Sequence, residues 1–288
     1  MTPNPPPSNE LACLDLALGR GPQPPPRATL RVPASASGPL PAAILLHGFK
    51  GFRRWGFQPY LAEAIARAGM VSIAIDFSGN GIGDDPLALT RLDLFEANTL
   101  AAELADVGAA LDLAQSRPEV DASRLALVGH SRGGAVALLA AARDRRVGAV
   151  ATLAAVADWE RRFPPGEWER AHRQGYAEVV NARTGQVLRI GSAHLAELRS
   201  PELDPRRAAS RLAVPVLLVH GDADESVAVE EGRELARTLP DGAARLVEIA
   251  GAGHTFGAVH PFAGSTPALE RGAAEITRFL LEVFAPAG

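Results

Sequence analysis

The chain has 288 residues, of which 47% are hydrophobic and 22% are charged. This composition is that of an ordinary globular protein, long enough for one large domain. A formal net charge of −4 gives no reason to expect nucleic acid or an anionic membrane as a partner. Cys13 is the only cysteine, which excludes an intramolecular disulfide and a cysteine-based metal cluster. Lys50 is the only lysine, a bias toward arginine that we attribute to coding.

The ends of the chain carry no targeting pattern. No apolar run reaches membrane-spanning length, and the N-terminus lacks a basic region followed by an apolar one. We therefore expect a cytoplasmic protein. Residues 1–9 are proline-rich and are expected to be disordered, whereas residues 10–288 are expected to form a single domain.

Apolar runs alternate with helical patterns along most of the chain. Residues 11–18 and 28–32 are predicted to form two antiparallel edge strands, joined by the proline-rich stretch 22–26. Further strands are predicted at 42–47, 71–76, 124–128, 147–156, 215–220 and 245–249, and helices at 58–68, 97–116, 135–142, 229–239 and 267–284. This alternation predicts the α/β class, with a doubly wound, mostly parallel sheet.

Residues 158–210 interrupt this alternation at a point where a short connection would suffice. They contain two of the three tryptophans, Trp159 and Trp168, together with Tyr176 and several arginines. We interpret the segment as a cap inserted over the carboxyl edge of the sheet, where open α/β sheets bind ligands. The alternative is a helical excursion that only covers the sheet.

A candidate nucleophile stands between a predicted strand and a predicted helix. Residues 129–133 read Gly-His-Ser-Arg-Gly, which matches G-x-S-x-G and places Ser131 at a sharp turn. Glycines let the two elements pass closely, and the turn exposes the hydroxyl near a helix N-terminus. The alternative is a glycine-rich turn with a capping serine, but the flanking strand and helix favour a nucleophile.

A serine nucleophile needs a base, and the base needs an orienting acid. His254 follows the last predicted strand and is the expected base, with His260 in reserve. Asp222 and Asp224 both follow the strand that ends at residue 220, and Asp158 is a weaker third candidate. Asp222 is well placed to cap its own turn, whereas Asp224 lies further out, where its loop can reach His254.

The other site expectations concern the oxyanion and the substrate. Backbone N–H groups of Phe49 and Arg132 are the expected oxyanion donors, because they follow the first parallel strand and the nucleophile. An apolar pocket for a compact or aromatic acyl group is expected from Phe49, Phe52, Trp55, Trp159 and Trp168.

Together these segments resemble the α/β-hydrolase superfamily, specifically its dienelactone-hydrolase-like and feruloyl-esterase-like serine hydrolases. The matching pieces are His-Gly-Phe-Lys-Gly at 47–51, Asp-Phe-Ser-Gly-Asn-Gly at 76–81, Gly-His-Ser-Arg-Gly at 129–133, His-Gly-Asp-Ala-Asp-Glu-Ser-Val at 220–227 and Gly-Ala-Gly-His at 251–254. The resemblance implies an α/β-hydrolase fold with a sheet of about eight strands, the acid at Asp224, and neither a cofactor nor a metal. Dienelactone hydrolases themselves use a cysteine nucleophile, where this chain has Ser131.

The leading prediction is a carboxylesterase that cleaves a small-molecule ester through a covalent acyl-enzyme. Ser131 attacks, His254 moves the proton and Asp224 orients His254. Two alternatives remain open, a peptidase with the same triad and a catalytically inactive hydrolase fold that serves as a small-molecule receptor. Hydrolysis of a generic activated ester separates the receptor from the two enzymes.

Overall fold

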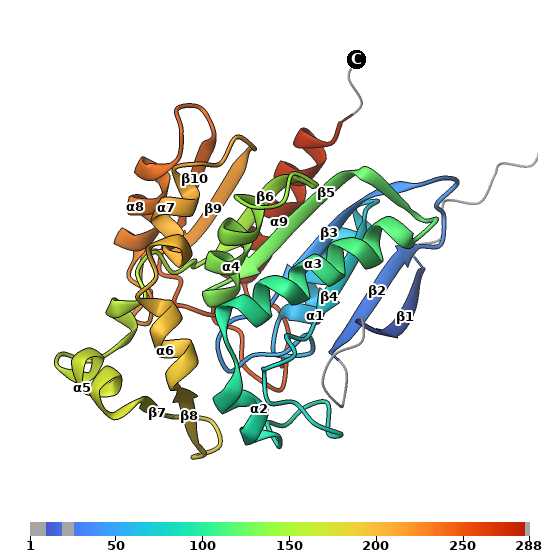
Figure 1. Ribbon diagram of the computed structural model, residues 1–288. Coiled ribbons are helices and arrows are strands. Elements are labelled where there is room, and N and C mark those ends of the chain that lie inside the picture. The colour runs from blue at the N-terminus through green and yellow to red at the C-terminus, as the bar shows by residue number, and fades with distance from the viewer. Residues whose placement is uncertain (1–9, 19–25, 286–288) are drawn as a thin grey trace, which may run out of the picture.

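The computed structural model describes residues 10–18 and 26–285 as a layered α/β domain (Figure 1). Eight strands form one sheet in the order β1-β2-β4-β3-β5-β6-β9-β10. β2 is antiparallel to β1 and β4, and all the other neighbours are parallel. The strands are β1 (Leu11–Ala17), β2 (Arg27–Pro33), β3 (Leu40–Leu46), β4 (Val71–Ile75), β5 (Val120–His130), β6 (Val147–Leu153), β9 (Val216–Gly221) and β10 (Ala244–Ile249).

The predicted fold class is therefore confirmed, including the antiparallel pair at one edge. The proline-rich stretch 22–26 lies almost wholly outside the described residues, and residues 1–9 lie entirely outside them.

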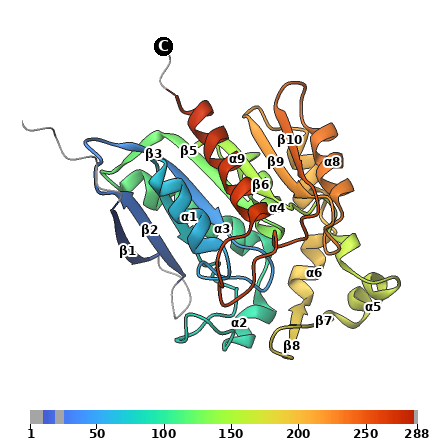
Figure 2. The same cartoon turned by 180° about the vertical axis from the view of Figure 1, so that it is seen from behind.

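Helices cover both faces of the sheet, as Figures 1 and 2 show. α1 (Gln58–Arg67) and α9 (Pro267–Val283) pack on one face, and α3 (Leu100–Ser116), α4 (Arg132–Ala141) and α8 (Val229–Thr238) on the other. Successive side chains of a strand point to opposite faces, so Ile44 of β3 joins one apolar layer and Leu45 the other. Among the helices described here, none is long and apolar enough to cross a bilayer.

The predicted helix 97–116 is α3, which begins three residues later than predicted and is preceded by a short helix that was not predicted, α2 (Leu92–Ala97). Asn98 and Thr99 between them have extended backbone, and the Thr99 hydroxyl caps α3 by accepting the Ala102 N–H at 3.0 Å. A threonine can form this cap only with non-helical backbone, so it begins a new helix at this point.

The segment 158–210 contains a β-hairpin that the sequence analysis did not predict. Its elements are η1 (Glu160–Arg162), α5 (Glu167–Gln174), β7 (Tyr176–Val180), β8 (Val187–Gly191), α6 (Ser192–Leu198), η2 (Pro201–Leu203) and α7 (Pro205–Ala209). β7 and β8 form a separate antiparallel pair beside α2, away from the edge strands β1 and β2 (Figure 1).

Candidate active site

Ser131 occupies a strained turn between β5 and α4. Its φ of 56° and ψ of −120° lie where non-glycine residues are rare. The turn is possible because its neighbours lack side chains: a Cβ on Gly133 would lie 2.4 Å from the Leu46 carbonyl oxygen, and one on Gly129 2.2 Å from the Gly133 carbonyl oxygen. The close approach of β3, β5 and α4 therefore requires glycine at both positions and leaves the Ser131 hydroxyl at the edge of the sheet.

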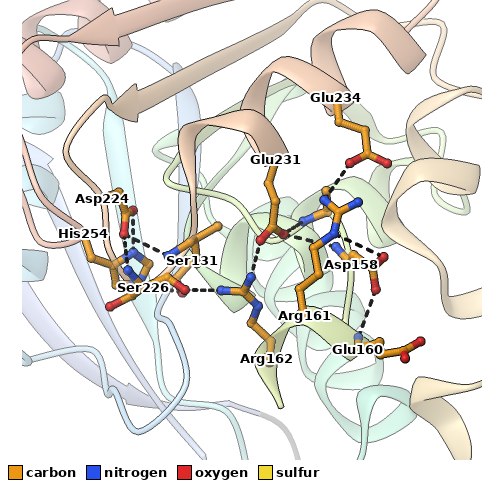
Figure 3. A network of polar contacts seen from close by, with 12 residues as sticks. Ser131, Asp158, Glu160, Arg161, Arg162, Asp224, Ser226, Glu231, Glu234 and His254 are labelled. Atoms are coloured by element: carbon orange, nitrogen blue, oxygen red, sulfur yellow. Dashed lines mark hydrogen bonds and ion pairs between the residues drawn. The ribbon is translucent and has the colours of Figure 1, made fainter. Parts of the chain in front are cut away.

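His254 reaches Ser131 from the loop after β10 (Figure 3). Its Nε2 lies 2.9 Å from the Ser131 Oγ, and its Nδ1 lies 2.8 Å from the Asp224 Oδ2. A carboxylate can only accept a hydrogen bond, so Nδ1 carries the proton and donates it. Nε2 is then left with the lone pair that accepts the hydrogen bond from the Ser131 hydroxyl. This is the geometry of a nucleophile, its base and the orienting acid.

The Asp224 carboxylate is fully enclosed in the loop after β9. Its Oδ1 accepts the Ser226 and Val227 N–H groups at 2.8 and 2.9 Å, while Oδ2 faces His254 and also lies 3.5 Å from the His220 Nε2. Burial by itself raises the pKa of Asp224, but hydrogen bonds from His220 and His254 outweigh it and hold the pKa well below its usual range. The acid therefore stays ionised when it receives the His254 N–H.

The alternative acids, Asp222 and Asp158, and the alternative base, His260, form other contacts. Asp222 accepts the Gly251 N–H at 2.6 Å, so it bridges to the loop that carries His254 instead of capping its own turn. Asp158 pairs with Arg206 at 3.0 Å. His260 accepts a backbone N–H through Nδ1 at 3.0 Å and stacks on Trp55.

Three further buried histidines near the site, at positions 47, 130 and 220, hold backbone in place, whereas His194 contacts the Arg132 guanidinium at 3.4 Å. The His130 Nε2–H donates to the His254 carbonyl oxygen at 3.0 Å. Burial, helped by the neighbouring His254, lowers the pKa of His130 to about 3, which keeps the ring neutral. His47 donates to the Gly48 carbonyl oxygen at 2.9 Å, and His220 to the carbonyl oxygen of residue 227 at 2.8 Å.

The two expected oxyanion donors flank the serine. Within the described residues, neither the Phe49 nor the Arg132 backbone N–H donates to a protein acceptor. The side chains of the two residues are also coupled. The buried Arg132 guanidinium forms a two-contact ion pair with Glu103, at 2.9 and 3.1 Å, and lies 5.5 Å from the centre of the Phe49 ring.

Two cavities meet at Ser131, with volumes of about 250 and 570 Å³. Phe49 borders both, Trp55 borders the smaller and Trp159 the larger. Phe52 and Trp168, expected in the pocket, line neither cavity. Phe52 is buried in a separate apolar cluster, and Trp168 supports the wall from behind by packing against Phe163, which lines the larger cavity.

The segment 158–210 supplies much of the wall of the larger cavity and is tied to the loop of the acid (Figure 3). Arg162 donates to the Ser226 carbonyl oxygen and forms an ion pair with Glu231 of α8. The other Glu231 oxygen accepts the backbone N–H groups of residues 157 and 158 at 2.8 and 3.2 Å. Because the Ser226 N–H binds Asp224, a continuous chain of contacts joins the acid to the inserted segment.

Sequence reasoning did not identify Glu231 or Glu103 as parts of this site. Each is an acidic residue on a helix and is at most 3% exposed. Acidic residues on helices are ordinarily solvated, so nothing in the local sequence distinguishes these two. For Glu231 the only signal was the presence of several arginines in the inserted segment, which need acidic partners when they are buried; Glu103 pairs with Arg132, outside that segment.

With this geometry established, comparison with known proteins is informative. The prolyl oligopeptidase family matches residues 55–286, a range that includes Ser131, Asp224 and His254. The chain belongs to the prolyl oligopeptidase family. It is thus a hydrolase of the α/β-hydrolase superfamily, as the sequence motifs predict.

The chain is also similar to a curated protein of Escherichia coli. The chain is 27% identical over 259 residues to an "uncharacterized 31.7 kDa protein in traX-finO intergenic region" of Escherichia coli, covering 78% of this chain and 87% of that protein.

Among solved structures, one described as ferulic acid bound to Est1E from Butyrivibrio proteoclasticus has a TM-score of 0.72 and 23% identity, covering 91% of this chain and 96% of that one. A putative dienelactone hydrolase from Klebsiella pneumoniae has a TM-score of 0.63 and 19% identity, covering 97% and 100%. At the level of the fold, these likenesses confirm the resemblance drawn from the motifs.

Proposed function

We propose that this hydrolase is a serine carboxylesterase that works through a covalent acyl-enzyme. The observation that carries the proposal is the linear arrangement of Ser131, His254 and Asp224, with 2.9 and 2.8 Å between successive polar atoms. In the first half-reaction, His254 Nε2 takes the hydroxyl proton as Oγ attacks the ester carbonyl. His254 then protonates the departing alcohol, and Ser131 carries the acyl group as an ester.

The second half-reaction uses the same groups with water in place of the alcohol. His254 removes a proton from water, hydroxide attacks the acyl-serine, and the proton returns to the Ser131 oxygen as the acid leaves. In both halves the carbonyl oxygen gains negative charge, and the Phe49 and Arg132 N–H groups are positioned to bind it. Such preorganised donors contribute about 3–4 kcal/mol each to lowering the barrier.

The cavity suggests a compact or aromatic acyl group as the substrate feature. Phe49 and Trp159 offer flat apolar walls beside the serine, and the segment 158–210 acts in this proposal as a cap over the site. The ferulic acid in the Est1E structure is an aromatic acid, which fits the same substrate class.

The second candidate is a peptidase with the same triad, and the family assignment favours it. An amide is harder to cleave than an ester because its nitrogen leaves only when it is protonated. The same His254 would then have to deliver its proton efficiently to an amine.

A panel of substrates tests both candidates. It contains short aliphatic, long aliphatic and hydroxycinnamoyl esters together with proline-containing peptide amides, each measured as kcat/KM. Esterase activity with compact acyl groups is the expected result. Preference for peptide amides would replace the proposal by the second candidate, and preference for long lipid-like chains would contradict a compact pocket.

A further inference from the structure

The smaller cavity beside Ser131 carries an unbalanced positive charge. Lys50 and Arg183 both line it, whereas no aspartate or glutamate does. Among the described residues, neither the Lys50 ammonium nor the Arg183 guanidinium has a carboxylate within ion-pair distance. Burial lowers the pKa of Lys50, and no nearby acid acts against it. The Lys50 ammonium lies 5.8 Å from the centre of the Phe49 ring, so it contacts an aromatic face and not an acid.

Lys50 also lines the larger cavity, where the carboxylates of Glu167 and Glu178 are paired with Arg170 and Arg189 and not with Lys50. Arg132 and Arg162 of the larger cavity, by contrast, are paired with Glu103 and Glu231.

A third polar group of the smaller cavity has no hydrogen-bond partner. Gln58, at the start of α1, is only 3% exposed, yet its side-chain amide forms no hydrogen bond within the described part of the chain. Buried polar side chains are nearly always hydrogen-bonded, so an unpaired amide at a cavity wall is an open donor and acceptor. Gln58 thus offers a neutral N–H beside the two cations.

The position of the cavity gives these three groups a role in the reaction. Ser131 and His254 border it, so a group bound there belongs to a molecule whose reacting carbonyl lies at the serine. Its volume of about 250 Å³ suits a short arm, and the larger cavity can hold the rest of the molecule. Lys50 is half-buried and Arg183 is exposed. Ammonium and guanidinium groups bind carboxylates through charge-assisted hydrogen bonds.

We propose that Lys50, Arg183 and Gln58 bind a carboxylate of the substrate. The preferred substrate is then an ester with a free carboxylate on a short arm next to the scissile bond, a statement that rests on the proposed esterase function. Lys50 directly follows the oxyanion donor Phe49, so the charge that it binds is held close to the reacting carbonyl.

Two matched pairs of esters test the inference by charge alone. On the acyl side, 4-nitrophenyl hydrogen glutarate is compared with its neutral methyl ester, and on the alcohol side, 4-acetoxybenzoate with its methyl ester. The wild type is expected to hydrolyse the charged member of at least one pair with a kcat/KM about tenfold higher. A ratio near one for both pairs would overturn the inference.

Variants of Lys50 and Arg183 test whether the smaller cavity causes the preference for charged esters. Lys50→Met and Arg183→Gln are expected to reduce the charged-to-neutral ratio toward one, and Lys50→Arg to restore it. Arg173→Gln is the matched control, because Arg173 is exposed on α5 and lines neither cavity. An unchanged ratio in both Lys50→Met and Arg183→Gln would contradict the assignment.

Calorimetric titration with glutarate separates this inference from the esterase proposal. Glutarate is expected to bind the wild type and to bind Lys50→Met at least about tenfold more weakly. Ester turnover without charge preference or glutarate binding would overturn the carboxylate site alone. Glutarate binding that depends on Lys50, in a protein that hydrolyses no ester, would support the anion site and contradict the esterase.

Discussion

The Asp224 Oδ2 lies 2.8 Å from the His254 Nδ1, across 30 residues of chain that separate the loops after β9 and β10. This contact determines which nitrogen of His254 is free to act as a base. The parallel pairing of β9 and β10 brings the two loops to the same edge of the sheet, where Ser131 directly follows β5.

Replacing Asp224 by asparagine should therefore affect kcat. An asparagine side chain can donate an N–H to His254 Nδ1, which favours the wrong tautomer and leaves no lone pair toward Ser131. We expect Asp224→Asn to lower kcat at neutral pH by a factor on the order of 10⁴. Steady-state kinetics on a generic activated ester, with circular dichroism as the check on folding, measures this.

Asp222→Asn is the matched control, two residues away on the same loop. Asp222 accepts the Gly251 N–H and contacts no member of the triad. We expect this variant to change the free energy of unfolding by about 1 kcal/mol and kcat only slightly. If Asp222→Asn abolished catalysis in a folded protein while Asp224→Asn did not, the acid would be Asp222.

Glu231 should matter for stability well beyond its single ion pair. Its buried carboxylate holds Arg162 and two successive backbone N–H groups at the start of the inserted segment. Glu231→Gln leaves the Arg162 charge without its buried partner, so we expect a loss of about 3 kcal/mol in the free energy of unfolding. Urea denaturation measures this loss.

Glu234, one turn further along α8, provides the comparison for Glu231. It pairs with Arg161 and Arg206 in a more exposed setting. Glu234→Gln should cost less than about 1 kcal/mol. If Glu231→Gln and Glu234→Gln lost the same free energy of unfolding, burial of the Glu231 carboxylate would not increase its contribution to stability.

Asp106 predicts a specific pH dependence of stability. Burial raises its pKa from 3.8 to about 6, although hydrogen bonds from Ser78 act to lower it. At a pH between 3.8 and about 6, Asp106 is ionised in the unfolded chain but still protonated in the folded chain. The free energy of unfolding therefore falls as the pH rises through this range. Across this range the free energy of unfolding falls by roughly 3 kcal/mol because of Asp106.

The variant Asp106→Asn tests this directly, because its side chain has no proton to lose. Urea denaturation of both proteins from pH 4 to pH 7 gives the difference in their free energies of unfolding. We expect the difference to shift in favour of the variant as the pH rises. A difference that stays constant over this range would contradict a raised pKa for Asp106.

Much of the fold could be predicted from the sequence because the strands are buried on both faces. Runs such as residues 42–46 and 215–219 are apolar throughout, and the histidines, glycines and other polar residues that follow them identify the loops at the active edge. The β7–β8 hairpin could not be predicted in this way. Val180 and Val187 are exposed and both strands carry polar residues, so the hairpin lacks the apolar pattern of a core strand.

Of the candidate site, too, only the part that depends on local motifs could be predicted from the sequence. Ser131 and His254 follow from local motifs. Phe52 and Trp168 were wrongly expected in the pocket, because the sequence does not show which way an aromatic side chain points. Only packing decides this: Phe52 turns into a buried cluster and Trp168 lies behind the wall. Lys50, the only lysine, was attributed to coding bias, because the absence of acids from the smaller cavity beside it is a property of the folded chain.

The most direct test of the account is whether Ser131 becomes covalently modified during catalysis. Intact-mass measurement after treatment with a fluorophosphonate should show one adduct on the wild type, mapped to Ser131, and none on Ser131→Ala. The same variant should lose activity by a factor on the order of 10⁴ to 10⁶. An unchanged adduct on folded Ser131→Ala, or retention of more than about a tenth of wild-type activity, would contradict a serine hydrolase centred on this residue.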